Sequence, residues 1–539
     1  MLKFLSAESK SVTGAAVVIS GATLASRLVG LLRDRALAHY FGAGPVLDAY
    51  YAAFKIPDLL YNLLIVGALT AGFIPTFTKL FYAGANKMPA WRLANNVLNL
   101  GVLILIILAA IAAIAAPLFV PLLAPGFAES TKNLTIQLTR LMLLSPILFG
   151  IAMVMGGVLQ SLRRFVIYSL APVLYNLGII AGAMLVGEFR LAPVALGWGV
   201  VGGASLHALS QIYGAWRVGW RWQGIVNLYD SATRRVGRLM LPRTLGLAMT
   251  QFNAVIITFL ASLLTSGSVA VYNFANNLQA VATGLIAIPF ALAVFPLLSQ
   301  TAAGGDRAAF GEHLARTIRQ ILFLTAPATI LLLLLRAQIV RVVLGSGQFN
   351  WDATIATADA LAFFALGLFA QGLIPLLARA FYALANTRTP FLMGLIAEAG
   401  SITAAVFLMR RLGVAGLALA GSLGAIINAV LLYAGLRLER GELAEDKLIT
   451  LLYKITGAGL GMALTVQLLK YLLSYLLNTT RWTGVFWWGL LAGSGGLAVY
   501  ALLCRILKLE EMIQLQASLK RRWLRLWQVP AGIDEAEQI

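Results

Sequence analysis

The sequence has few of the residues that carry chemistry in a soluble enzyme. Of its 539 residues only 12% are charged, three are histidine and one is cysteine. The single cysteine, Cys504, excludes an intramolecular disulfide and a multi-thiolate metal site. No phosphate-binding loop, His-Glu-x-x-His zinc motif or Gly-x-Ser-x-Gly nucleophile motif is present. We therefore expect no enzymatic activity, no cofactor and no metal site.

Apolar residues take the place of the missing charges. Hydrophobic residues make up 60% of the chain, and the mean hydropathy is +0.85. A soluble domain carries about a quarter charged residues, so this chain cannot cover its surface with polar groups in water. Apolar runs of roughly 18 residues or more recur along the whole length, which is enough to cross a bilayer as a helix. The sequence predicts an all-α polytopic membrane protein with about fourteen transmembrane helices.

The predicted spans follow these apolar runs. They are 15–40, 46–83, 93–123, 134–160, 167–187, 191–216, 239–265, 268–300, 318–345, 354–384, 390–410, 412–437, 448–477 and 482–506.

Basic residues give the orientation. The formal net charge is +20, and Lys and Arg gather in alternate connections such as 84–92, 161–166, 217–243 and 302–319. Cytoplasmic loops take such an excess, so we predict a multi-pass membrane protein with both termini in the cytoplasm. No cleavage site follows the short N-terminal segment, and we predict no removable signal peptide. Because the charge lies between spans and no recognition module accompanies it, we expect no nucleic-acid partner.

Two stretches of the chain resemble one another. GPVLDAYYAAFKIPDLLYNLLIVGALTAGFIP (44–75) and GSVAVYNFANNLQAVATGLIAIPFALAVFP (267–296) both begin at a glycine-led turn and end in an apolar-Pro pair. Each half of the chain holds six predicted spans, so both copies enter the membrane in the same direction. Such parallel repeats form two lobes related by an axis along the membrane normal. The predicted parts are an N-lobe (1–216), a basic cytoplasmic linker (217–238), a C-lobe (239–437), two extra spans (438–506) and an amphipathic cytoplasmic tail (507–539).

Charged residues within the first two spans are the main candidates for function. An unpaired charge in hydrocarbon costs several kcal/mol, so such residues mark substrate or ion pathways. We favour a cavity lining for Arg27, Arg33 and Lys55, and an interfacial position for Arg35 and His39. The other candidates in this region are Asp34, which can pair with Arg33, and Asp48.

Other polar residues leave alternatives open. Glu398 lies in the eleventh span near Ser401 and can either bind a coupling cation or proton, or pair with a basic group. Arg243, at the start of the seventh span, is an interfacial anchor or points into the cavity. His207 is more simply a hydrogen-bonded packing residue than a proton relay. Without a nucleotide-binding motif, energy coupling would come from a monovalent cation or from the membrane potential.

The first two spans also carry a family resemblance. SRLVGLLRDRALAHYFGAGPVLDAYYAAFKIPDLLYNLLIVGALTAGFIP (26–75) contains a Ser-Arg-x-x-Gly-x-x-Arg-Asp motif, a Tyr-Phe-Gly-x-Gly turn and a Phe-Lys-x-Pro-Asp motif. This stretch resembles the MurJ/MviN family of lipid II flippases, as do 260–278 and 378–391. The likeness extends over essentially the whole chain.

The resemblance implies a fold and a function. The fold is that of the multidrug/oligosaccharidyl-lipid/polysaccharide exporter superfamily, in which the extra helix pair forms a groove for the polyprenyl tail. The implied substrate is lipid II, the undecaprenyl-pyrophosphate-linked peptidoglycan precursor, moved to the outer leaflet by alternating access. Arg27, Arg33, Asp34, Asp48 and Lys55 match the family motif and would carry substrate binding, with Arg243 added as a substitute cation. Cell-wall synthesis proteins would be further partners, and the bacterial inner membrane would be the location.

Some family charges are missing. Tyr61 and Asn62 stand where many members have two arginines, Val66 replaces a glutamate, and Asn277 replaces an arginine of the eighth span. Three alternatives therefore stay open: export of another polyprenyl-linked glycan, a multidrug or cation antiporter of the same fold, and a non-transporting membrane scaffold.

Overall fold

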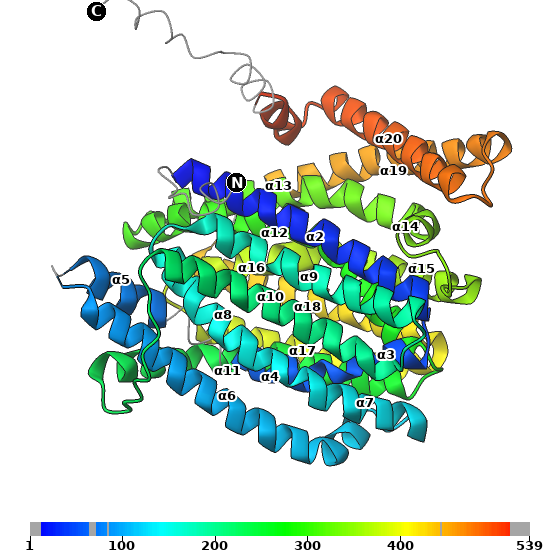
Figure 1. Ribbon diagram of the computed structural model, residues 1–539. Coiled ribbons are helices and arrows are strands. Elements are labelled where there is room, and N and C mark those ends of the chain that lie inside the picture. The colour runs from blue at the N-terminus through cyan, green and yellow to red at the C-terminus, as the bar shows by residue number, and fades with distance from the viewer. Residues whose placement is uncertain (1–11, 64–71, 84–85, 442–444, 518–539) are drawn as a thin grey trace, which may run out of the picture. The chain divides into compact units, whose positions relative to one another are not determined.

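The computed structural model describes residues 12–63, 72–83, 86–441 and 445–517, and these are almost entirely helical. Figure 1 labels the helices by number. The first half comprises α2 (Val12–Phe41), α3 (Pro45–Ala53), α4 (Lys55–Tyr61), α5 (Ile74–Tyr82), α6 (Met88–Leu123), α7 (Glu129–Met142), α8 (Leu144–Ser161), α9 (Phe165–Glu188), the 3-10 turn η3 (Pro193–Ala195) and α10 (Leu196–Arg217). The second half comprises α11 (Ser231–Ser262), α12 (Ser268–Ala303), α13 (Arg307–Leu334), α14 (Arg336–Val343), α15 (Trp351–Leu366), α16 (Leu368–Ala383), α17 (Arg388–Leu412), α18 (Val414–Arg440), α19 (Glu445–Leu476) and α20 (Trp482–Ile506).

The helices confirm the predicted all-α membrane class. Among the described residues nine helices or helix pairs are long and apolar enough to cross a membrane, and α15 with α16, bent by 45°, makes a tenth. The predicted total of fourteen is not confirmed. The other four predicted spans fall on α2, the α3–α5 segment, α10 and α11.

The chain divides into two compact units. Unit 1 contains residues 1–281, 343–364 and 395–424, and unit 2 contains residues 282–342, 365–394 and 425–539. Each unit draws on both halves of the sequence, and the predicted lobes stay a prediction.

In unit 1, α2, α9 and α10 lie side by side (Figure 1). Glycines allow α9 and α10 to approach closely, because a Cβ at Gly178 or Gly182 would overlap the backbone of Gly203 or Gly199. Both helices thus carry a small-xxx-small pair at one contact, the arrangement that brings membrane helices together. The close packing of α9 on α10 therefore explains Gly178, Gly182, Gly199 and Gly203.

Three asparagines on α6 hold the segment that leads into α11. Asn95 Nδ2 donates to Arg221 O at 3.0 Å, Asn96 Nδ2 to Asn227 O at 2.8 Å, and Asn99 Nδ2 to Gln223 O at 2.7 Å. In return, Asn95 and Asn96 accept from backbone N–H groups of the segment. Residues 221–227 are not helical, so these amides satisfy backbone groups that a helix would pair internally. The predicted basic linker is therefore fixed to α6, and α11 begins inside it at Ser231.

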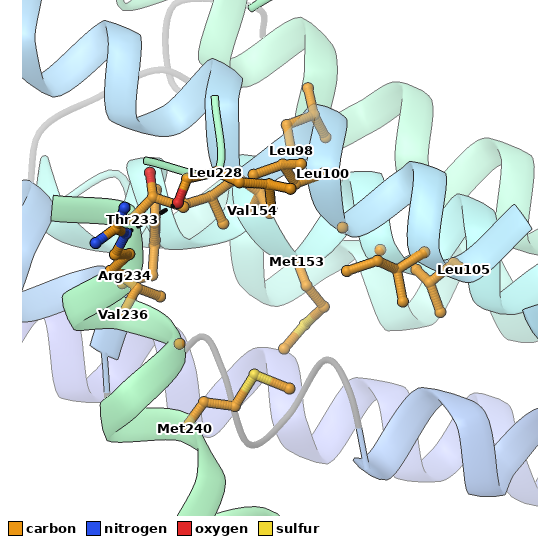
Figure 2. Close-up of a pocket in the computed structure, with 16 residues that line it drawn as sticks. Leu98, Leu100, Leu105, Met153, Val154, Leu228, Thr233, Arg234, Val236 and Met240 are labelled. Carbon is orange, nitrogen blue, oxygen red and sulfur yellow. Dashed lines mark hydrogen bonds between the residues drawn. The ribbon is translucent and has the colours of Figure 1, made fainter. Parts of the chain in front are cut away.

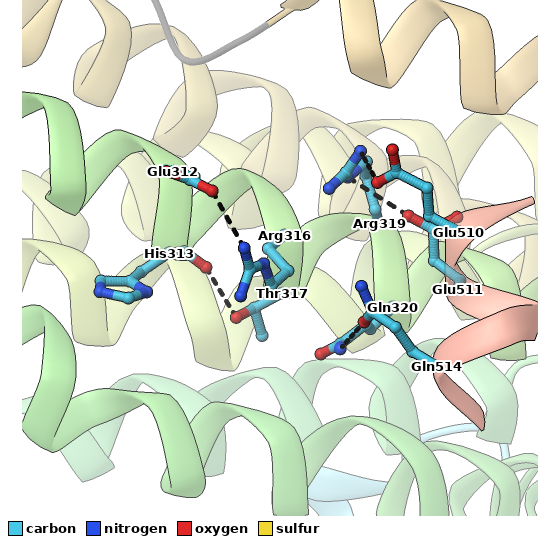
Figure 3. Close-up of polar contacts among 9 residues, drawn as sticks. All are labelled: Glu312, His313, Arg316, Thr317, Arg319, Gln320, Glu510, Glu511 and Gln514. Atoms are coloured by element: carbon cyan, nitrogen blue, oxygen red, sulfur yellow. Dashed lines mark hydrogen bonds and ion pairs between the residues drawn. The ribbon is translucent and has the colours of Figure 1, made fainter. Parts of the chain in front are cut away.

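Unit 2 has an apolar core built from α12, α13, α16, α18, α19 and α20. A helical segment over 510–517 joins it: Leu509 and Glu511 are buried, and Arg319 on α13 forms ion pairs with Glu510 at 3.4 Å and Glu511 at 3.3 Å. Figure 3 shows these pairs beside the Gln320–Gln514 contact. Buried Cys504 lies in the same core and packs there as a small apolar residue. The rest of the predicted amphipathic cytoplasmic tail, 518–539, lies outside the described residues, so its amphipathic character stays a prediction.

Candidate functional site

Arg33 and Asp34 neutralise each other on α2. Arg33 donates from Nε and Nη2 to Asp34 Oδ1 at 3.0 and 2.8 Å. Its Nη1 donates to Asn176 Oδ1 on α9 at 3.1 Å, and Asn277 Nδ2 on α12 donates to Asp34 Oδ2 at 3.0 Å. The side chain of Asp34 is buried, where an unpaired carboxylate would be costly. The four residues therefore form one polar chain that joins α9, α2 and α12.

Arg27 is less completely paired than Arg33. It lies two turns nearer the start of α2, and its Nη1 donates to the backbone oxygen of Ala280 at 2.8 Å. Its Nε is buried and has no hydrogen-bond partner among the described residues. A backbone carbonyl satisfies one donor but brings no negative charge, so Arg27 keeps its net positive charge for an anion.

Asp48 caps the start of α12. Its Oδ2 accepts from Gly267 N at 2.5 Å and its Oδ1 from Ala270 N at 2.9 Å. The side chain is buried, and a carboxylate at this position matches the positive end of the helix dipole. Gly267 has φ +93°, and a Cβ there would overlap Ala43 O. This geometry gives Asp48 a positioning role between α3 and α12, and its predicted substrate contact stays a prediction.

Lys55 lines a polar pocket of about 200 Å³ in unit 1. The pocket lies between α4, α11 and α12, and its polar lining is Lys55, Asn253, Thr258, Tyr272, Asn273 and Asn276. Asp58, one turn along α4, is exposed. One ammonium group surrounded by amides and hydroxyls can bind an anionic, hydroxyl-rich group.

Glu398 on α17 accepts a hydrogen bond from Asn253 Nδ2 on α11. Because Asn253 also lines the Lys55 pocket, Glu398 is coupled to that pocket through one amide. Ser401 does not share this bond: it is buried, and its Oγ donates to Ala420 O on α18 at 3.1 Å. The described residues contain no cluster of three His, Cys, Asp or Glu side chains that could hold a metal.

The remaining predicted residues have separate surroundings. The side chain of Arg243 lies outside the described part of the structure, as does Val66. Arg35 Nη1 donates to Val343 O at 3.3 Å, and the side chain of His39 is exposed. His207 packs edge-on against Phe149 with ring centroids 5.3 Å apart. This contact fits the predicted packing, but the buried Nδ1 of His207 has no hydrogen-bond partner among the described residues, so the predicted hydrogen bond is not found at that atom.

Sequence reasoning missed the amides of the site. Asn176, Asn253, Asn273, Asn276 and Asn277 are neutral, so a search for ionisable residues within spans passed over them. Their sequence signal is an amide inside an apolar run, such as the pair Asn276–Asn277 in α12. Such a side chain in hydrocarbon requires a hydrogen-bond partner.

Comparison with known proteins now places the chain. The family model described as "Lipid II flippase MurJ" matches residues 37–486, a range that includes Asp48, Lys55 and Glu398. The chain belongs to the MurJ family. Its many apolar helices and this membership together make it a multi-pass membrane protein.

Individual relatives agree with the MurJ family model. A Rhizobium meliloti protein named "Probable lipid II flippase MurJ" is 30% identical over 469 residues, which cover 85% of this chain and 86% of the relative. A Burkholderia cenocepacia protein named "Lipid II flippase MurJ" is 29% identical, with 79% and 84% covered.

Solved structures support the fold. "Lipid II flippase MurJ, inward closed conformation" aligns with a TM-score of 0.74 and 23% identity, over 91% of this chain and 98% of that one. A multidrug resistance MATE family transporter in an inward-facing conformation aligns with a TM-score of 0.65 and 15% identity, over 80% and 99%. At these identities the likeness concerns the fold alone.

The residues at which the resemblance leads us to expect charges make contacts through neutral side chains instead. Tyr61 packs against Phe149 with ring centroids 5.2 Å apart, Asn62 donates to Asp58 O at 2.9 Å, and Asn277 donates to Asp34. At the Asn277 position a neutral amide keeps Asp34 available to Arg33, whereas an arginine there would compete for the same carboxylate.

Proposed function

We propose that this chain is a flippase for lipid II, the undecaprenyl-pyrophosphate-linked peptidoglycan precursor, and moves it from the inner to the outer leaflet for peptidoglycan synthesis. The observation that carries the proposal is the MurJ family match over residues 37–486. The proposal involves transport across the membrane and assigns no catalysed reaction to the chain.

Arg27 and Lys55 are the residues proposed to bind the pyrophosphate. A pyrophosphate entering a low-dielectric cavity needs cationic donors, and each such charge-assisted bond is strong where water is excluded. The unpartnered Nε of Arg27 and the position of Lys55 in a polar pocket support this role. Arg33 is already paired with Asp34. We propose that it positions the site and contributes less to pyrophosphate binding, because Asp34 offsets much of its charge. Arg243 remains a proposed contributor from α11.

The amides beside Lys55 fit the rest of the head group. Asn253, Asn273 and Asn276 offer both donors and acceptors within one pocket, which suits the hydroxyl and amide groups of a sugar-peptide. The proposed tail site is the groove formed by α19 and α20, as the resemblance implies.

Alternating access requires contacts that form in one state and break in another. The bonds from Asp48 to the first turn of α12 are the proposed contacts of this kind, since they join the α3 end of one predicted lobe to the other. Coupling is proposed at Glu398 and Ser401, through a monovalent cation or through the membrane potential. Both termini are proposed to be cytoplasmic, and cell-wall synthesis proteins are proposed partners.

Two measurements test the function. The first supplies the gene to a bacterium depleted of its own lipid II flippase and measures growth and outer-leaflet lipid II. The second reconstitutes the purified chain in liposomes and follows translocation of labelled lipid II against that of another polyprenyl-linked glycan. Restored growth and selective movement of lipid II support the proposal. Movement of the other glycan alone, or of neither lipid, overturns it in favour of a different cargo or a scaffold.

A further inference from the structure

A second, apolar pocket lies in unit 1 beside the basic end of α11. Its volume is about 300 Å³, which is within the range of small-molecule sites. Its walls come from α6, α8 and α11, with Leu98, Leu105, Met153, Val154 and Met240 among the lining side chains. Figure 2 shows Thr233 and Arg234 at one end and Leu105 at the other. The pocket is an apolar slot with a cation at its mouth.

The slot has unfilled space and an open side. A Cβ at Gly101 or Gly237, both in its wall, would meet no atom within 4 Å. Two other lining residues are largely exposed, Ile104 at 45% and Leu228 at 66%. An apolar ligand can therefore enter from the surface of the unit.

The mouth of the slot is strongly basic. Arg234, Arg235 and Arg238 follow one another on the first turns of α11, and all three side chains are exposed. The Nε of Arg234 donates to Leu228 O at 3.2 Å, and its guanidinium lies 5.3 Å from the Tyr229 ring centroid. The nearby carboxylate of Asp230 is occupied in capping α11, where it accepts from Thr233 N at 2.7 Å. Three arginines beside the single carboxylate of Asp230 leave a net positive charge next to an apolar opening.

The surroundings suit the membrane interface. Exposed Trp222 and Tyr229 belong to the segment fixed on α6, and such aromatic residues gather at the level of lipid head groups. On α6, the residues that line the slot run from Val97 to Leu105. At about 1.5 Å per residue, they lie about 14–26 Å from the start of that helix. A lipid with its head group at the arginines would direct its chain into the slot.

We propose that this pocket binds one acyl chain of an anionic glycerophospholipid, whose phosphate lies on Arg234 and Arg238. Charge complementarity selects an anionic over a zwitterionic lipid, since clustered basic residues at a membrane surface attract anionic head groups. The proposal does not depend on the transported substrate, because it concerns a resident lipid held by α6, α8 and α11.

Photolabelling of the full chain tests it. The protein is placed in phosphatidylcholine nanodiscs containing a small fraction of phosphatidylglycerol with a photoactivatable group near the end of one acyl chain. We expect labels on the peptides that contain 97–105 and 150–154, competed by unlabelled phosphatidylglycerol. Equal competition by phosphatidylcholine overturns the proposed selectivity, and loss of label only with undecaprenyl pyrophosphate assigns the slot to the substrate tail instead.

Matched variants distinguish labelling inside the slot from labelling on the outer surface of the protein. Gly101→Phe or Gly237→Phe should fill it and abolish the label, whereas Gly202→Phe, at an exposed glycine of α10 with equal room, should not. Arg234→Gln with Arg238→Gln should weaken phosphatidylglycerol competition by about fivefold per arginine, and Arg410→Gln with Arg411→Gln should leave it unchanged. Melting temperatures identify misfolded variants, and unchanged labelling in folded Gly101→Phe and Gly237→Phe proteins overturns the proposal.

Discussion

Three cations of the first two spans differ in what neutralises them. Arg33 has a carboxylate in direct contact, Arg27 has a backbone carbonyl, and Lys55 has a pocket of amides with the Asp58 carboxylate one helical turn away. A cation in direct contact with a carboxylate gains less from a new anion than one whose direct contacts are neutral. The proposed ranking for head-group binding is therefore Arg27 and Lys55 ahead of Arg33.

Replacing the two less neutralised cations should impair transport. Arg27→Ala or Lys55→Ala removes a charge-assisted hydrogen bond worth about 1.5–3 kcal/mol, which is roughly a tenfold to hundredfold loss. The rate of lipid II translocation in liposomes measures this loss, with the exposed Arg411→Ala as the control. Unchanged rates in both variants would contradict the proposed site and would agree with a scaffold.

Asp34→Ala should act on stability. It leaves Arg33 without its carboxylate, and breaking a buried pair from one side costs about 3–5 kcal/mol. The melting temperature in detergent should fall clearly, and the double variant Arg33→Gln with Asp34→Asn should recover much of the loss. A single variant as stable as the parent would show that the pair is not a structural element.

At this scale the sequence predicted the charged residues and not their partners. The Arg-Asp motif identified Arg33 and Asp34, but Asn176 and Asn277 are 143 and 243 positions away from the residues they bond. Only the packing of α9 and α12 against α2 brings them together, and no local pattern encodes that packing.

At the scale of the element, the start of α12 depends on Asp48. Asp48→Ala removes both acceptors from the first turn of the helix, and loss of a helix cap costs about 0.5–2 kcal/mol. We expect a modest fall in melting temperature together with a change in the distance between labels on α3 and α12. Asp352→Ala, at the exposed first turn of α15, is the control. If neither the distance between the labels nor the transport rate changes, Asp48 has no role in the proposed alternating access.

The α9–α10 contact should tolerate no side chain. Gly182→Leu places a branched side chain against the backbone of Gly199, so the helices must separate. We expect loss of folded protein on size-exclusion chromatography. Gly202→Leu on the open side of α10 should behave like the parent, and equal behaviour of the two variants would disprove close packing.

Element positions could largely be predicted, since hydrophobic length marks a helix in lipid. The breaks could not: the predicted span 46–83 contains α3, α4 and α5, and the span 354–384 is bent at Gly367. The first of these runs contains Asp48, Lys55 and Asp58, but hydropathy averaged over the length of a span does not resolve single residues, so it predicts the span and not its breaks.

At the scale of the whole molecule, Glu398 is the residue through which an ion gradient would act. Glu398→Gln keeps the hydrogen bond to Asn253 and removes the charge. If a monovalent cation drives transport through this residue, the variant should still bind lipid II and should lose the dependence of its rate on that ion. Liposomes with and without a sodium or proton gradient measure it, and Ser401→Ala tests the second candidate. An unchanged ion dependence would contradict coupling at Glu398.

The family and the helical membrane class could be predicted for the whole molecule, because the Ser26–Pro75 motif is specific and the apolar runs are long. The compact units could not. Unit 1 joins residues 1–281 to 343–364 and 395–424, and such long-range grouping arises from contacts that hydropathy does not record.

The neutral Arg33–Asp34 pair has a consequence for electrical work. One elementary charge that crosses the full membrane potential exchanges about 2.3 kcal/mol per 100 mV, whereas a pair with equal and opposite charges exchanges almost none. Movement of this pair alone would therefore contribute little gating charge. Voltage sensitivity would come from Arg27, Lys55 and the phosphates that they bind. The charge moved across the membrane per transported lipid would therefore depend more on the charge of the lipid than on the movement of α2.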